Sequence, residues 1–95
     1  MKYYYVDFEN VHDAGLNGIA NLSTDCQVTI YWSQKADKLS FNSLTAIMKS
    51  NARISYVQVM STQENAMDKK ILQDLRAQTN SDKKSEYFII SNDND

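Results

Sequence analysis

The chain has 95 residues, of which 42% are hydrophobic and 11% aromatic, a composition that predicts one folded domain and argues against disorder. Its formal net charge of −2 lacks the positive balance typical of nucleic-acid binders. Cys26 is the single cysteine, which excludes an intramolecular disulfide, and no apolar run is long enough for a membrane span or a signal peptide. We therefore expect a cytoplasmic protein without a membrane partner.

The first half of the chain predicts two strands, each followed by a helix. Lys2 to Asp7 is a strand rich in Tyr and Val. Asp13 is predicted to cap a short helix, whose apolar stripe is Leu16, Ile19, Ala20 and Leu22. Gln27 to Ser33 is a second strand of β-branched and aromatic residues. Ser40 is predicted to cap a second helix, whose apolar stripe is Phe41, Leu44, Ile47 and Met48.

The second half repeats this alternation. Arg53 to Met60 alternates apolar and polar residues, as a half-covered edge strand does. Ser61 and Glu64 match a capping box at the start of the longest predicted helix. The apolar side of that helix carries Met67, Ile71, Leu72 and Leu75. Glu86 to Ser91 is the fourth predicted strand.

Strands that alternate with helices predict parallel pairing with right-handed crossovers. The expected fold is an α/β three-layer sandwich whose parallel sheet has the strand order 3-2-1-4, formed by a single domain over residues 1–95. No helix follows the fourth strand, so we expect a domain that is incomplete at its C-terminal end. An apolar edge strand without a neighbour invites pairing, and a homo-oligomer or a partner chain covering the fourth strand is therefore expected.

Acidic residues follow the two strands that flank the switch point of this order. Asp7 ends the first strand, and Asp93 and Asp95 follow the fourth. Asp68 lies near the start of the third helix, one turn after Glu64, and that helix leaves from the same rim of the sheet. Carboxylates gathered at the carboxyl ends of parallel strands predict a site for Mg²⁺, which prefers oxygen ligands. Such a site suits metal-assisted attack of water on a phosphodiester.

Three segments of the chain resemble the acidic signatures of PIN-like nucleases, in particular of the NYN-type branch. They are Val6–Asn10 (VDFEN), Glu64–Asp68 (ENAMD) and Ile90–Asp95 (ISNDND). The resemblance implies a ribonuclease that depends on Mg²⁺ or Mn²⁺, acts on single-stranded RNA, and has a 3-2-1-4-5 sheet, whose fifth strand and last helix this chain lacks. It implies catalytic and metal-binding roles for Asp7, Asp68, Asp93 and Asp95. The implied supporting polar residues are Asn10, Ser91 and Glu64.

Each of these residues also has a plainer interpretation. Glu64 is explained by the predicted capping box, and Asp68 beside Lys69 and Lys70 by an ordinary solvated helix face. Glu9 is expected to be exposed. Lys35 could contact a phosphate backbone, but scattered lysines are usually solvent charges. The alternative function is a catalytically incomplete PIN-like module that binds RNA or a partner protein. Loss of activity on addition of a chelator would separate the enzyme from this binding module.

Overall fold

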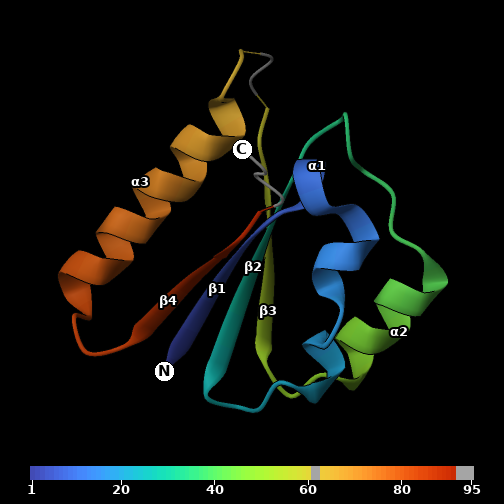
Figure 1. Cartoon of the computed structure of the whole chain (residues 1–95), viewed down its shortest axis with the longest axis horizontal. Helices are drawn as coiled ribbons and strands as arrows, with labels where there is room; N and C mark the ends of the chain where they lie inside the picture. Colours follow the sequence, from blue (N-terminus) through green and yellow to red (C-terminus); the bar gives the residue numbers. More distant parts are fainter. Residues whose placement is uncertain (61–62, 92–95) are drawn as a thin grey trace.

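The computed structural model describes residues 1–60 and 63–91. These residues form a four-stranded parallel sheet in the order β3-β2-β1-β4, with helices on both faces (Figure 1). The strands are β1 (Lys2–Asp7), β2 (Cys26–Trp32), β3 (Arg53–Gln58) and β4 (Glu86–Ile90). The predicted α/β sandwich and its strand order 3-2-1-4 are confirmed, with β3 at an edge as the alternation of its residues indicated.

Two layers of helix cover the sheet (Figure 1). One face carries α1 (Phe8–Val11), the 3₁₀ helices η1 (His12–Leu16) and η2 (Ile19–Asn21), and α2 (Phe41–Lys49), and the other carries α3 (Ala66–Ser81). The prediction of a short helix capped by Asp13 is therefore wrong, because two 3₁₀ helices occupy this segment. Gly18 lies between them at φ 87°, a left-handed conformation that a continuing helix does not contain. Within the described residues, no helix has both the length and the apolar character that crossing a membrane requires.

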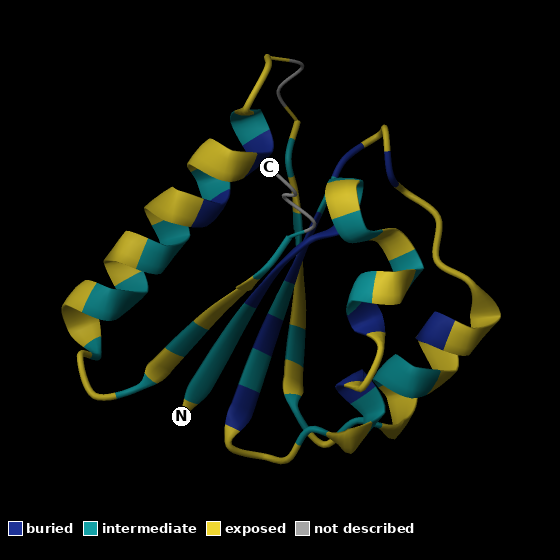
Figure 2. Ribbon diagram, viewed as in Figure 1, coloured by how far each residue is buried: buried dark blue, intermediate teal, exposed yellow. Residues whose placement is uncertain are grey.

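The side chains of β1 and β2 contribute to two cores, one on each face of the sheet. The buried residues of the sheet lie in these two strands (Figure 2). Toward α2 the core consists of Val6, Phe8, Leu16, Ile19, Val28, Ile30 and Ala36. Toward α3 it is smaller and consists of Tyr5, Tyr31, Met67 and Ile71. In the parallel register Asp7 is the partner of Tyr31, and Val6 is the partner of Ile30 and Ile90. The central strand thus carries Asp7 to the carboxyl edge of the sheet between two neighbouring strands.

The structure confirms the cap of α2 and corrects the face that α2 buries. Ser40 Oγ accepts a hydrogen bond from the backbone N–H of Ser43 at 3.0 Å, as an N-cap does. Of the predicted apolar stripe, only Ile47 packs against the core, together with Ala46. The other three members are exposed to 88%, 40% and 77%, namely Phe41, Leu44 and Met48. Periodicity identifies an apolar side of a helix but not the direction in which that side points.

The start of α3 also differs from the prediction. The helix begins at Ala66, and Asn65 before it adopts a left-handed conformation with φ 65°. Glu64 therefore precedes the helix and is not part of a capping box at its start, and Ser61 lies outside the described residues. Met67 and Ile71 are buried as expected, and Leu72 is exposed. The left-handed turn at Asn65 places the first turn of α3 at the carboxyl edge of the sheet.

Candidate functional site

Asp7 is a buried carboxylate whose two oxygens are both held by one neighbour. Its side chain is 1% exposed. Asp7 Oδ1 accepts a hydrogen bond from the backbone N–H of Asn10 at 3.3 Å, and Asn10 Nδ2 donates to Asp7 Oδ2 at 2.5 Å. Asp7 thereby caps α1, whose first N–H groups have no partner within the helix. The same contacts fix the orientation of the carboxylate at the end of β1.

The surroundings of Asp7 oppose its ionisation. Burial raises the pKa of the Asp7 carboxyl above its usual value, and the negative charges of Asp68 and Glu9 raise this pKa further. The two hydrogen bonds from Asn10 act in the opposite direction, because they stabilise the ionised form. The effect of Asp68 on Asp7 shows that the two carboxylates lie within electrostatic range of each other.

These groups line a polar pocket of about 240 Å³ between α1 and the start of α3. Four acidic residues from two stretches of the chain line it, namely Asp7, Glu9, Glu64 and Asp68. Asn10 and Lys35 also line it, and Lys35 is the one cation of the lining among the described residues. Asp68 lies in the first turn of α3, where the helix dipole favours a negative charge. We call this cavity the acid pocket.

The structure corrects one expectation at the acid pocket and adds an exposed cation to its lining. Glu9, expected to be exposed, is half-buried and accepts a hydrogen bond from the hydroxyl of the buried Ser33. The backbone N–H of Lys35 donates to Ser33 Oγ at 3.2 Å, so the turn after β2 holds Lys35 beside the acids. The position of Lys35 just after a strand's carboxyl end is the sequence signal that could have identified it.

A partly buried hydrogen bond links α3 to the sheet. The hydroxyl of Tyr31, the register partner of Asp7, donates to Asp74 Oδ2 at 2.7 Å. Lys70 Nζ lies 3.2 Å from Asp74 Oδ1, one turn earlier on the same helix. Burial, followed by the bond to Asp74, raises the pKa of Tyr31, so its hydroxyl stays protonated and continues to donate. These contacts hold α3 against the sheet, with Asp68 in the lining of the acid pocket.

The remaining predicted site residues lie at or beyond the end of β4. Ser91 is half-buried and follows Ile90, the partner of Val6, at the same edge as Asp7. Asp93 and Asp95 lie outside the described residues. Within residues 1–60 and 63–91, no group of three or more His, Cys, Asp or Glu side chains is arranged to hold a metal ion. Asp7 and Asp68 nevertheless offer oxygen ligands of the kind that Mg²⁺ and Mn²⁺ prefer.

Comparison with known proteins gives one match. The family model described as PIN domain (PIN7) matches residues 1–95, the whole of the chain. Neither the curated proteins nor the solved structures contain a match.

Proposed function

The chain belongs to the PIN domain family, and from this premise we propose that it is an endoribonuclease that uses Mg²⁺ or Mn²⁺ to cleave single-stranded RNA. PIN domains are usually nucleases and typically use one of these two ions. The observation that carries the proposal is the acid pocket, in which the buried and oriented Asp7 lies within electrostatic range of Asp68. Asp7 is buried and Asp68 is exposed in the lining of the same pocket, and a cation bound between them would compensate the charges that repel one another.

Within this proposal the metal ligands are Asp7 and Asp68 in the acid pocket, together with Asp93 and Asp95. A bound divalent ion would supply an activated water and neutralise charge on the phosphate. Asn10 holds both oxygens of Asp7, which reduces the freedom of the carboxylate before a ligand arrives. Ser91 and Glu64 are proposed as further polar groups at the rim.

Lys35 is the residue best placed to contact the substrate backbone. The acid pocket carries four carboxylates, which repel a phosphate, and Lys35 adds a cation to the same lining. A lysine ammonium binds phosphate as a compact point charge. We propose that Lys35 binds a non-bridging phosphate oxygen of the RNA strand on the α1 side of the acid pocket.

We further assign the chain to the NYN-type branch. Its first motif places Asn10 three residues after Asp7, and the structure joins these two side chains by a hydrogen bond. The motif thus has a physical role, since the asparagine orients the aspartate that ends β1.

The test is cleavage of a fluorescently labelled single-stranded RNA with Mg²⁺ or Mn²⁺. We expect Asp7→Asn and Asp68→Asn to abolish cleavage with an unchanged circular dichroism spectrum. Glu86→Gln, an exposed acid at the opposite end of β4, is the matched control and should leave the rate unchanged. Cleavage that persists in excess EDTA would refute the proposal. Metal-independent RNA binding without cleavage would instead identify a catalytically incomplete module.

A further inference from the structure

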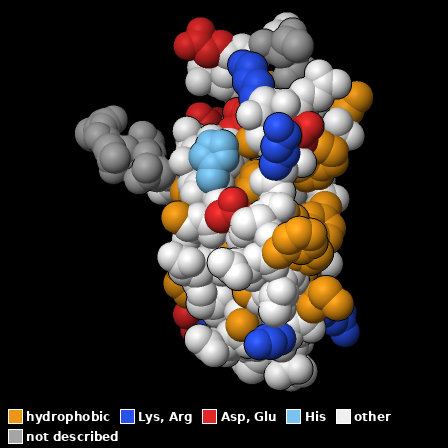
Figure 3. Space-filling model, turned by 90° about the vertical axis from the view of Figure 1, so that its right-hand side faces the viewer, with side chains coloured by type: hydrophobic (Ala, Val, Ile, Leu, Met, Phe, Trp, Pro, Cys, Tyr) orange, Lys and Arg blue, Asp and Glu red, His pale blue; other side chains and the backbone are white. Residues whose placement is uncertain are grey.

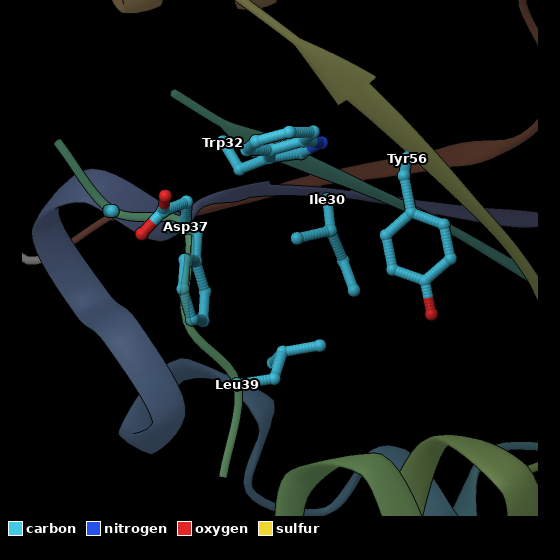
Figure 4. A pocket seen from close by; sticks show the side chains of 7 residues that line it. Ile30, Trp32, Asp37, Leu39 and Tyr56 are labelled. Atoms are coloured by element: carbon cyan, nitrogen blue, oxygen red, sulfur yellow. The ribbon is translucent and has the colours of Figure 1, made fainter. Parts of the chain in front are cut away.

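A second cavity, of about 230 Å³, lies on the α2 face of the sheet. In Figure 4, Trp32 and Leu39 form opposing walls with Ile30 between them, and Tyr56 closes one side. Tyr56 is 50% exposed, so the cavity opens to solvent. Its lining is predominantly apolar and aromatic and consists of Phe8, Ile30, Trp32, Ala36, Asp37, Leu39 and Tyr56. We call it the aromatic pocket.

The aromatic pocket and the acid pocket meet at α1 and at the turn after β2, which contribute residues to both linings. Phe8 of the aromatic pocket directly follows Asp7, and Trp32 directly follows Tyr31, the register partner of Asp7. The turn after β2 separates the two cavities, with Lys35 lining the acid pocket and the next residue lining the aromatic pocket. The two cavities are therefore neighbours on either side of this turn.

The turn between the cavities is held in place. The backbone N–H of Ala36 donates to the carbonyl oxygen of Ser33 at 2.9 Å, and these two residues form an isolated bridge. The hydroxyl of Ser33 donates in turn to Glu9, which fastens the turn to α1. The spacing between the two cavities is therefore set by hydrogen bonds and not by a free loop.

We propose that the aromatic pocket binds one nucleobase of the RNA strand whose phosphate lies at the acid pocket, an inference that rests on the proposed function. Nucleobases stack on aromatic side chains, and single-stranded RNA presents unstacked bases that can enter a pocket. The apolar walls and the carboxylate of Asp37 exclude a phosphate from the interior. Lys35, on the other side of the turn, supplies the cation that the phosphate needs.

The polar groups of the aromatic pocket predict which bases it prefers. The Asp37 carboxylate lies on the side of the cavity opposite Tyr56 (Figure 4). An ionised carboxylate only accepts hydrogen bonds, so it pairs with N–H donors. Adenine, cytosine and guanine offer N–H donors through an exocyclic amino group, whereas the single N3–H of uracil lies between two carbonyl oxygens that repel a carboxylate. We therefore expect adenylate to bind more tightly than uridylate.

Exposed apolar side chains near this pocket suggest a second type of ligand, namely the surface of another protein. Figure 3 shows hydrophobic side chains gathered along one side of this face, with Lys or Arg side chains above them. Phe41 and Leu44 of α2 are exposed, as is Leu39 at the mouth of the pocket. A protein surface could cover such a patch. The nucleobase is favoured because the cavity adjoins Lys35 and the acid pocket through one fastened turn.

Trp32 makes the test direct, since it is the chain's single tryptophan and lines the cavity. The probe is a short adenylate oligonucleotide in EDTA, so that binding is measured without cleavage. We expect it to quench the tryptophan fluorescence. Tyr56→Leu should weaken binding about tenfold or more, by the usual value of one base–aromatic stack. Tyr56→Phe should bind as the wild type does.

Two further comparisons sharpen the test. Phe88→Leu replaces an aromatic residue on the opposite edge strand, 37% exposed, and should leave adenylate binding unchanged. Asp37→Asn should reduce the difference in affinity between adenylate and uridylate oligonucleotides. An equal loss of binding in Tyr56→Leu and Phe88→Leu would overturn the assignment of the pocket.

The outcomes separate this inference from the proposed function. Cleavage by the wild type without quenching at the same oligonucleotide concentrations would overturn the base site and leave the nuclease standing. Quenching that Tyr56→Leu weakens, without cleavage in Mg²⁺ or Mn²⁺, would support the base site and refute the nuclease. Self-association that is lost in Tyr56→Leu, without quenching in the wild type, would identify the pocket as part of a protein interface and overturn the inference.

Discussion

Asp7 occupies a position that favours function over stability. It is almost fully buried, and the negative charges of Asp68 and Glu9 act on it. A buried carboxylate that is paired only with an asparagine loses the solvation of its ionised form. Its hydrogen bonds with Asn10 recover part of this loss and at the same time orient both oxygens. Asp7 therefore destabilises the end of β1, although the proposed chemistry depends on it.

We expect Asp7→Asn to raise the melting temperature at neutral pH. The pKa of Asp7 is raised on folding, so the folded protein binds this proton more tightly than the unfolded chain. The contribution of Asp7 to stability is therefore largest below its unfolded pKa and is lost as pH rises through its folded pKa. The exposed amide of Asn10 can turn over to pair with the new side chain.

Thermal unfolding of both proteins from acid to neutral pH measures this effect. The difference in melting temperature should be small in acid and should grow as pH rises. A variant that is less stable than the wild type at neutral pH would contradict the account of Asp7 as a destabilising charge.

Asn10 is predicted to act as a positioning residue. Asn10→Ala removes the bond to Asp7 Oδ2 but keeps the backbone bond to Oδ1, so α1 remains capped. Loss of a residue that orients a metal ligand typically lowers metal affinity or activity by about 10- to 100-fold. We therefore expect a fall in kcat of about this size, with little change in KM. His12→Ala, an exposed neighbour at the end of α1, is the control. A change in KM alone would assign Asn10 to substrate binding.

At the scale of elements, the orientation of α3 depends on one buried hydroxyl. Tyr31 is 1% exposed and donates to Asp74, which Lys70 also contacts. We expect Tyr31→Phe to lower the free energy of unfolding by about 1 kcal/mol, the usual net value of one hydrogen bond. Because the bond joins the helix to the sheet, hydrogen exchange should increase throughout α3.

Tyr4→Phe is the matched control for this prediction. Tyr4 is half-buried and stacks on Phe88, and its hydroxyl has no hydrogen bond with the described residues. Chemical denaturation should therefore find Tyr4→Phe close to the wild type. Equal losses in the two variants would show that the Tyr31 hydroxyl does not hold α3.

Features of the helices that depend on neighbouring residues could be predicted from the sequence. Features that depend on packing against distant parts of the chain could not. The Ser40 cap depends on a residue three positions away, and it is confirmed. The start of α3 depends on Asn65 entering a left-handed conformation, a choice that no neighbouring residue dictates. The apolar stripe of α2 was visible as a pattern, but only packing determines that Ile47 meets the core while Phe41 meets solvent.

The candidate site shows the same division. The strand order alone predicts that Asp7 and the first turn of α3 reach one edge, and the structure brings Asp68 there. The part of Glu9 in the site was not predicted, and Lys35 was not distinguished from other lysines, because both positions depend on Ser33, which donates to Glu9 and accepts from the Lys35 backbone N–H. A contact between α1 and the turn after β2 produces no periodic pattern of residues in the sequence, so it cannot be predicted from periodicity.

At the scale of the whole molecule, two sheet edges determine how the protein meets other chains. Within the described residues, β3 and β4 each pair with a single neighbouring strand. After Glu86, β4 carries no charged residue, and Phe88 and Ile89 are 37% and 46% exposed. Natural edge strands are usually protected by charges, by proline or by a covering element. Neither edge strand has a proline or a charge in its centre, but β3 contains the polar Ser55 and Gln58 whereas β4 is apolar after Glu86, so β4 is the edge that we expect to pair.

We therefore predict that this chain self-associates through β4. Ile89→Lys places a charge in the centre of the edge, opposes pairing with a second copy, and should shift the protein toward a monomer. Met48→Lys, on the exposed side of α2, is the control for the other apolar surface. Sedimentation equilibrium across micromolar concentrations measures both variants against the wild type. A monomeric wild type would contradict the prediction, and dissociation by Met48→Lys alone would transfer the contact to α2. Dissociation by Ile89→Lys alone would show that the exposed backbone of β4, and not the helix layer, joins the copies.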